Sequence, residues 1–385
     1  MKKNLKITLA IVIPVIISSS IVGVLINHFY FRDNTSILDQ SILSIMEEYG
    51  IPGVAVSAVT NNEIVWMNSY GFSNIEENIQ VTEDTLFMLG SISKSVVGTA
   101  FMQLVEDSLI NLDDDINNYL PFNINHPIYH NYTITPRMLL THTSGIHDNW
   151  QIIYPMQTSG SDSPIELEEF LFNYLHENGS YFQITNFNSY TPGTSFDYTN
   201  VGSTLVAYLI ETITYTSFEQ YCQENLFQPL DMPNTSWRLA NLNVNDIATP
   251  YDESYGYFFP IIHYGSPVYP CGFLRTSILQ FSHFLMAIIN GGNYGEAVIL
   301  QNSSVNAMTT VQFPNISSYT GLFWQSDGEY WGHGGSGPGV STLMLYHPIR
   351  KQGVIVFMNV ENPEATSILL QEVFMAWQYN EIYEN

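Results

Sequence analysis

Ser91 and Lys94 form the sequence S-x-x-K, and they are the pair in this chain that is best suited to nucleophilic catalysis. If a helix begins at about Ser91, residues three positions apart lie on one face, so the lysine amine would lie beside the serine hydroxyl. A serine hydroxyl is a poor nucleophile near neutral pH and needs a neighbouring base, which a desolvated lysine can be. The alternative is an ordinary helix start with an exposed lysine, because so short a motif recurs by chance.

Tyr198-Thr199-Asn200 supplies two more groups that suit this chemistry. A tyrosine beside Lys94 could carry a proton between the serine and a leaving group. The side chain of Asn200 could hold a substrate amide. The structural alternatives are that Tyr198 lies in the core and that Asn200 caps the helix expected from Val201. For Asn200 both roles are compatible.

The stretch His333-Gly334-Gly335-Ser336 lies on or just after a predicted strand. Glycines allow a substrate backbone or carbonyl to come close, which favours Gly334 and Gly335 as substrate-binding positions. The backbone amides of Ser336 and Ser91 could together form an oxyanion hole, and His333 would add a polar or cationic group near the serine. The alternative is a glycine-rich turn with an incidental histidine.

The elements that must position these groups are strands at both ends of the chain with helices between them. Predicted strands are 53–60, 63–70, 330–333, 341–347 and 353–360; predicted helices are 37–49, 91–105, 165–176, 201–215, 218–227, 280–290 and 365–379. The economical arrangement is an α/β fold with one antiparallel sheet shared by the two ends and a helical region inserted. We therefore expect a sheet subdomain of about 37–90 and 265–380 and a helical subdomain of about 91–264, in which 147–200 is irregular but mostly helical.

Composition limits the partners. The 385 residues carry a formal charge of −26 with only ten Lys and Arg, which excludes nucleic acid as a natural partner and disfavours polyanionic substrates. The histidines at 126, 130, 142 and 147 lack a compact zinc pattern, so we expect no metal and no cofactor. Cys222 and Cys271 form no C-x-x-C pattern; they could form one disulfide outside the cell, or Cys222 could simply be a core residue.

The N-terminal segment 1–36 predicts export. Lys2, Lys3 and Lys6 precede an uncharged, apolar run over 7–26, long enough to span a bilayer. An uncleaved signal anchor is favoured because the run stays apolar to its end, and a cleaved signal peptide is the second interpretation. In both, the lysines stay inside and the rest of the chain is exported. The third interpretation is a soluble cytoplasmic protein in which the N-terminal segment is a buried helix.

Together with several other stretches, the three motifs resemble those of the class C β-lactamase and D-alanyl-D-alanine carboxypeptidase family, which also includes esterases and D-aminopeptidases. FMLGSISK resembles the first family motif, YTN the second and HGG the third. The other matching stretches are LINLDDDINNYLPF, ITPRMLLTHTSGI, PGTSFDYTNVGSTLVAYLIE and CGFLRTSILQFSHFLMAIINGG. They occur in the family's order and cover about 37–380.

The resemblance implies a role for each motif residue. Ser91 would be the acylated nucleophile, Lys94 its partner base and Tyr198 the proton relay. Asn200 would orient the substrate, and His333 would take the place of the lysine in the third motif. The implied fold is a mixed α/β sheet flanked by helices, with a helical subdomain and the site between them. Within THTSG, we interpret Thr141, His142 and Ser144 as mainly architectural.

One departure from the family pattern bears on the substrate. True β-lactamases and many carboxypeptidases have K-T-G as the third motif, where the lysine helps bind the substrate carboxylate. A histidine is mostly neutral near neutral pH, so His333 favours esters or other small amides over β-lactams and peptidyl-D-alanine. We therefore expect an exported serine hydrolase acting through a serine acyl-enzyme on a small-molecule or peptide substrate. The rival is a non-hydrolytic surface protein that binds or senses cell-wall peptides, or that is acylated once without turnover.

Overall fold

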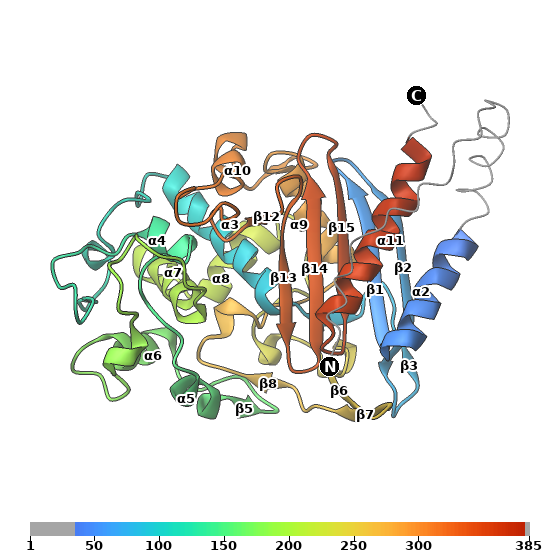
Figure 1. Cartoon of the computed structure of the whole chain (residues 1–385), viewed down its shortest axis with the longest axis horizontal. Helices are drawn as coiled ribbons and strands as arrows, with labels where there is room; N and C mark the ends of the chain where they lie inside the picture. Colours follow the sequence, from blue (N-terminus) through green and yellow to red (C-terminus); the bar gives the residue numbers. More distant parts are fainter. Residues whose placement is uncertain (1–34, 382–385) are drawn as a thin grey trace, which may run out of the picture.

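One antiparallel sheet, built by both ends of the chain, is the centre of the fold (Figure 1). The computed structural model describes residues 35–381. Seven strands lie in the order β12-β13-β14-β15-β1-β2-β3. Their bounds are β1 Gly53–Thr60, β2 Ile64–Asn74, β3 Ile79–Gln80, β12 Gln325–Ser326, β13 Trp331–Gly337, β14 Val340–His347 and β15 Gln352–Met358. Because β1 pairs with β15 along its whole length, the predicted sheet shared by the two ends is confirmed.

The sheet is buried on both faces. Alternate side chains of β1 belong to two different clusters: Val54 and Val56 to one, Ala55 and Val59 to the other. The first cluster includes side chains of α2 (Thr35–Tyr49) and α11 (Pro363–Glu381), and Figure 1 shows α11 crossing one face of the sheet. The second includes α3 (Ser93–Glu106) and α9 (Ile278–Ile289). Helices on both faces explain why the central strands are apolar at nearly every position.

The middle of the chain forms the helical region beside the sheet (Figure 1). Its helices are α4 Pro136–Leu140, α5 Trp150–Ile153, α6 Leu167–Leu175, α7 Asn200–Thr214 and α8 Phe218–Cys222, and α10 is Asn302–Met308. Short strand pairs join the parts: β4 Leu86–Met88 with β9 Arg275–Ser277, β5 Thr158–Ser159 with β8 Tyr264–Gly265, and β6 Tyr251–Ser254 with β7 Tyr257–Pro260. α7 is buried from Val201 to Ile210 and packs against α3. A hydrogen bond between Lys94, at the start of α3, and Asn200, the first residue of α7, shows that the two helix starts lie side by side.

Three expectations about local structure are corrected. Ser91 lies in a 3-10 turn, Gly90–Ile92, and α3 begins only at Ser93. The helix predicted over 218–227 continues from α8 as a π-helical turn over its second half. Over 147–200 the structure has only α5 and α6 as α-helices, so this region is mostly loop. In this region polar side chains donate hydrogen bonds to backbone carbonyls, which in a helix would accept from backbone N–H groups. Asn186, for example, donates to the carbonyls of residues 174 and 181.

Two other predictions from the sequence concern the cysteine pair and the N-terminal segment. Cys222 and Cys271 are both buried free thiols, so the disulfide alternative is wrong and Cys222 is a core residue. The signal anchor or signal peptide over 1–36 lies outside the described residues, apart from the start of α2. In the part of the chain that the structure covers, no helix has both the length and the apolar character needed to cross a bilayer.

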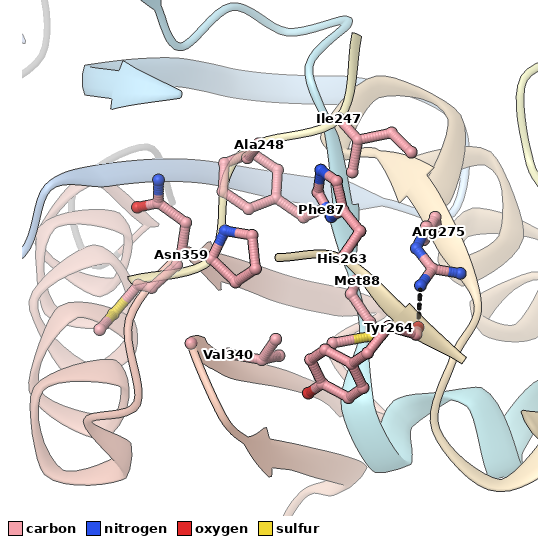
Figure 2. A pocket seen from close by; sticks show the side chains of 12 residues that line it. Phe87, Met88, Ile247, Ala248, His263, Tyr264, Arg275, Val340 and Asn359 are labelled. Atoms are coloured by element: carbon pink, nitrogen blue, oxygen red, sulfur yellow. Dashed lines mark hydrogen bonds between the residues drawn. The ribbon is translucent and has the colours of Figure 1, made fainter. Parts of the chain in front are cut away.

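Arg275, on β9, is a buried residue that binds the backbone of neighbouring segments, and Figure 2 shows its contact with Tyr264. Its Nη1 donates to the carbonyls of Trp237 and Phe273 at 3.1 Å each, and its Nη2 to that of Tyr264 at 2.9 Å. Burial lowers the pKa of Arg275 to about 10, which leaves it protonated near neutral pH. It also lines a small internal cavity of about 10 Å³ with Asn359. Arg275 therefore fixes backbone whose side chains reach the cleft described below.

Arg275→Met is expected to lower the free energy of unfolding by about 2–4 kcal/mol, since three buried carbonyls lose their donor. Urea unfolding followed by circular dichroism measures this loss. Arg350→Met is the control: Arg350 is exposed and contacts Glu329 at only 3.8 Å, so its loss should cost less than about 0.5 kcal/mol. Equal stabilities for the two variants would contradict the role given to Arg275.

Candidate active site

Ser91 is held on a tight turn directly against β13. Gly90 has φ +55°, a conformation that glycine adopts without strain, and a Cβ there would lie 2.9 Å from the backbone nitrogen of Ser336. On the other side, a Cβ on Gly335 would lie 2.1 Å from the carbonyl oxygen of Leu89 and 3.0 Å from the nitrogen of Ser91. Gly335 is therefore required for this backbone approach, apart from any contact with substrate.

Lys94 is fully buried, and its amine meets the serine as the sequence predicts. Nζ lies 3.0 Å from Oγ of Ser91, 2.7 Å from Oδ1 of Asn200 and 2.8 Å from the carbonyl oxygen of Cys271. Oδ1 of Asn200 and the carbonyl of Cys271 can only accept, so each takes one N–H of the amine. The remaining position of the nitrogen faces the Ser91 hydroxyl, which accepts from an ammonium and donates to a neutral amine. No sequence motif predicts the Cys271 contact, because any residue can supply a backbone carbonyl.

Tyr198 lies beside this amine, in the last turn of chain before α7. Its ring centroid is 4.7 Å from Nζ of Lys94 and 4.3 Å from the ring of His142. Its hydroxyl is buried and has no hydrogen-bond partner among the described protein groups. With Ser91 it lines the same cleft, but the amine of Lys94 faces the ring and no described hydrogen bond joins the phenol to Lys94 or Ser91, so the proton relay stays a prediction.

Two buried histidines surround Tyr198. His142 accepts a hydrogen bond from the backbone N–H of Thr199 at 3.2 Å, which supports the architectural role predicted for it. Burial and the nearby charge of Lys94 place the pKa of His142 well below its ordinary range. The same two causes lower the pKa of His333 to about 4. Both imidazoles are therefore neutral near neutral pH.

His333, Gly334, Gly335 and Ser336 lie within β13, opposite Met344 and the three residues that precede it in β14, so the turn alternative is wrong. The Nδ1 of His333 lies 2.6 Å from the carbonyl of Gly334, and its Nε2 is buried without a described partner. The strand brings the Ser336 amide to the cleft that Ser91 also lines. The two residues whose amides are predicted to form an oxyanion hole thus line one space, and the hole itself stays a prediction.

The cleft consists of two cavities, of about 400 and about 410 Å³, that share Ser91, Tyr198 and Ser336. The first has mostly apolar walls, formed by Met88, Trp150, Ile153, Tyr154, Val268, Phe273 and Val340. The second runs along β13 to the start of α11 and includes Gln325, His333, Leu343, Thr366 and Ser367. Among the described residues that line either cavity, none is Asp, Glu, Lys or Arg. No charged side chain thus forms the described walls, although a carboxylate lies at their edge, where Oγ of Ser336 donates to Glu361 at 2.8 Å.

Comparisons with known proteins agree with this site. Residues 38–372 match the family model described as Beta-lactamase. The chain belongs to the β-lactamase family. Among its relatives, Protein flp of Staphylococcus aureus is 24% identical over 338 residues, which is 86% of this chain and 64% of that protein. The putative penicillin-binding protein PbpX of Bacillus subtilis is 28% identical over 326 residues, 84% of this chain and 74% of that protein.

Solved structures of penicillin-binding proteins show the same fold. The octameric penicillin-binding protein homologue from Pyrococcus abyssi superposes with a TM-score of 0.74 at 24% identity, over 90% of this chain and 77% of that one. The penicillin-binding protein from Bacillus halodurans gives 0.68 at 21% identity, over 87% and 98%. The predicted fold class, a β-lactamase-like antiparallel sheet flanked by helices, is confirmed. The chain spans less than two thirds of the length of Protein flp.

Acidification is expected to destabilise this β-lactamase-family site through its buried histidines. The pKa of His333 is about 4 in the folded state, against an ordinary value of 6.5. Below 6.5 the unfolded chain therefore binds a proton that the folded state does not, and stability falls until about pH 4, by on the order of 3 kcal/mol from this group. His333→Asn should reduce the fall in unfolding free energy between about pH 7 and about pH 5, measured in urea.

His130→Asn is the matched control, because His130 is exposed to solvent. It should leave the pH dependence of the parent protein unchanged. An equal slope in the parent and in His333→Asn would show that His333 is not held neutral in the folded state.

Proposed function

We propose that the chain is a serine hydrolase that forms an acyl-enzyme at Ser91 and acts on esters or small amides with uncharged groups on both sides of the scissile bond. The observation that carries the proposal is the 3.0 Å contact between the buried amine of Lys94 and the Ser91 hydroxyl, in a cleft without charged walls. Membership of the β-lactamase family supports a serine-hydrolase function in general.

The reaction has two acyl-transfer steps. The step requires Lys94 as the neutral amine, which, with Tyr198, accepts the proton of Ser91 as Oγ attacks the substrate carbonyl. The backbone N–H groups of Ser91 and Ser336 donate to the oxyanion. Tyr198 gives a proton to the leaving oxygen or nitrogen, and the acyl group stays on Oγ. A water molecule then attacks the acyl carbon, loses its proton to the same relay, and releases a carboxylic acid and free Ser91.

The substrate class follows from the third motif. A β-lactam or a peptide ending in D-alanine carries a carboxylate, which a lysine at this position would pair with. His333 is buried, and its pKa of about 4 keeps it neutral near neutral pH. A substrate carboxylate in this cleft would therefore lose its hydration without gaining a cationic partner. Neutral esters and amides pay no such penalty.

We also propose that the catalytic domain acts outside the cytoplasm, either anchored by the apolar run over 7–26 or released after cleavage. The support is the charge pattern of the first residues, with Lys2, Lys3 and Lys6 before that run. Fractionation of cells that express the full chain tests this. Recovery of the chain in the cytoplasm alone would contradict export.

A pair of matched esters tests the substrate class. After subtraction of the hydrolysis without enzyme, which the neighbouring carboxylate accelerates in the succinate, the purified protein is expected to hydrolyse p-nitrophenyl butyrate with a kcat/KM at least about tenfold higher than that for mono-p-nitrophenyl succinate. In the succinate a carboxylate replaces the terminal methyl group of the acyl chain. His333→Lys is expected to narrow this ratio because it restores a cation. A preference of the parent for the succinate would overturn the proposed substrate class.

The same assay separates hydrolysis from the rival of a surface protein that binds cell-wall peptides or is acylated only once. Release of many equivalents of p-nitrophenol per protein molecule supports turnover. One equivalent followed by a halt would favour the rival.

A further inference from the structure

Asp148 is a buried carboxylate in the loop between α4 and α5, which no motif of the sequence singles out. Its oxygens accept hydrogen bonds from the backbone N–H groups of Asn200 and Val201, at 2.8 and 3.0 Å, and from Oγ1 of Thr199 at 2.8 Å. The carboxylate thus lies at the N-terminus of α7, where the helix dipole stabilises a negative charge. This end of the helix carries both Tyr198 and Asn200.

A further contact connects Asp148 with the nucleophile. Nδ2 of Asn200 donates to Oδ2 of Asp148 at 2.8 Å, while Oδ1 of Asn200 accepts from Nζ of Lys94 at 2.7 Å. An asparagine amide can be flipped, so either its oxygen or its nitrogen could face the lysine. Both oxygens of Asp148 act as acceptors for backbone N–H groups, so the Asn200 side chain presents its nitrogen to Asp148 and its oxygen to Lys94. A continuous chain of hydrogen bonds therefore runs from Asp148 through Asn200 and Lys94 to Ser91.

Helix capping alone does not account for this arrangement. α7 already has an N-cap, because Oγ1 of Thr199 accepts a hydrogen bond from the backbone N–H of Gly202 at 3.2 Å. The contact with the Asn200 side chain adds nothing to the helix backbone, and it is the contact that leads to the nucleophile.

We propose that Asp148 is a positioning residue that fixes the orientation of the Asn200 amide, so that Asn200 holds Lys94 against Ser91. The inference rests on the proposed function, because its effect is read from reactions at Ser91. Asp148→Asn presents an amide in place of the carboxylate. Its nitrogen can then face Asn200, which allows the Asn200 amide to flip and to turn a donor toward Lys94.

Asp148→Asn is expected to lower kcat for p-nitrophenyl butyrate and the rate of fluorophosphonate labelling at Ser91 by about 10²-fold, with KM within about threefold of the parent. The pH profile of kcat/KM should shift as well, since the partner of Lys94 has changed. Ser217→Ala is the stability control: it removes the side-chain cap of α8, and Ser217 lines neither cavity of the cleft. It should lower the melting temperature and leave kcat and the pH profile unchanged.

A double-mutant cycle measures the energetic coupling between Asp148 and Asn200. In an Asn200→Ala background, Asp148→Asn should change kcat by less than about threefold, because no amide remains to be oriented. The inference is overturned if Asp148→Asn has the kcat and pH profile of the parent, or if it costs as much with Asn200→Ala as without it.

A second variant and the turnover of the parent protein complete the test. If Asp148→Asn does not fold, Asp148→Glu is measured: it keeps the charge but displaces Asn200, and a folded Asp148→Glu protein with parental kcat would overturn the inference. A parent protein without turnover speaks against the proposed function, whereas a parent with turnover and an unaffected Asp148→Asn variant speaks against the role of Asp148 alone.

Discussion

Ser91→Ala is expected to lower the hydrolysis of p-nitrophenyl esters by a factor on the order of 10⁴ or more, and to abolish covalent labelling by fluorophosphonate or penicillin-type probes. The physical reason is that the Ser91 hydroxyl is the oxygen held by the Lys94 amine in the cleft. Without that oxygen no acyl-enzyme forms, and only binding and the oxyanion hole remain. Intact-protein mass spectrometry after probe treatment measures the labelling directly.

Ser303→Ala is the control for this experiment, because Ser303 is an exposed serine on α10. It should be labelled and should turn over like the parent. Hydrolysis retained by Ser91→Ala at the parental rate would end the acyl-enzyme hypothesis for this cleft.

Lys94→Ala has the second-largest expected effect, a loss of about 10² or more in kcat/KM, as is typical for a group that moves the nucleophile's proton. The change also removes the one donor that Ser91 Oγ, Asn200 Oδ1 and the carbonyl of Cys271 share. Lys94→Met keeps most of the side-chain volume. An equal loss in both variants therefore assigns the effect to the amine and not to a cavity.

An independent readout is the imidazole of His333, whose pKa is lowered to about 4 by burial and by the charge of Lys94. In Lys94→Met that charge is gone, so the pKa of His333 should rise toward 6.5, which NMR titration of the imidazole nitrogens measures. Parental kcat/KM in Lys94→Met, or a His333 titration identical to that of the parent, would contradict the role of Lys94.

Much of the sheet could be predicted because its strands have a clear local pattern. The strand over 53–60 has the predicted bounds, and the antiparallel sheet from both chain ends follows from the order of strands and helices. The predicted start of the helix at Ser91 was wrong. The turn around Ser91 is shaped by the approach of β13 to Gly90, and this contact joins segments that are far apart in the sequence. The region over 147–200 has few helices because its polar side chains bind backbone groups, which composition alone did not reveal.

In the candidate site, too, contacts within one segment could be predicted, whereas contacts between distant segments were harder to predict. The contact between Ser91 and Lys94 follows from spacing along one short segment. Tyr198, Asn200 and His333 were placed near it by motif resemblance, and the structure brings them together. Asp148 was missed because its partners are a helix end and a side chain from another segment.

The walls of the cleft were also missed. Trp150 and Tyr154 are half-exposed aromatic residues on short helical turns, and nothing in their sequence context relates them to a nucleophile. Their place depends on how the loop after α4 folds back over the cleft, which is a property of tertiary structure.

The pairing of β1 with β15 makes the order of synthesis matter. A growing chain that has only reached the helical region already contains the serine, the lysine and the tyrosine, but β1 lacks one of its two neighbours. β13, which closes the turn around the nucleophile, has also not been made. A product of early termination should therefore be inactive and sensitive to proteases. Ser91 should become reactive only when the C-terminal strands have joined β1.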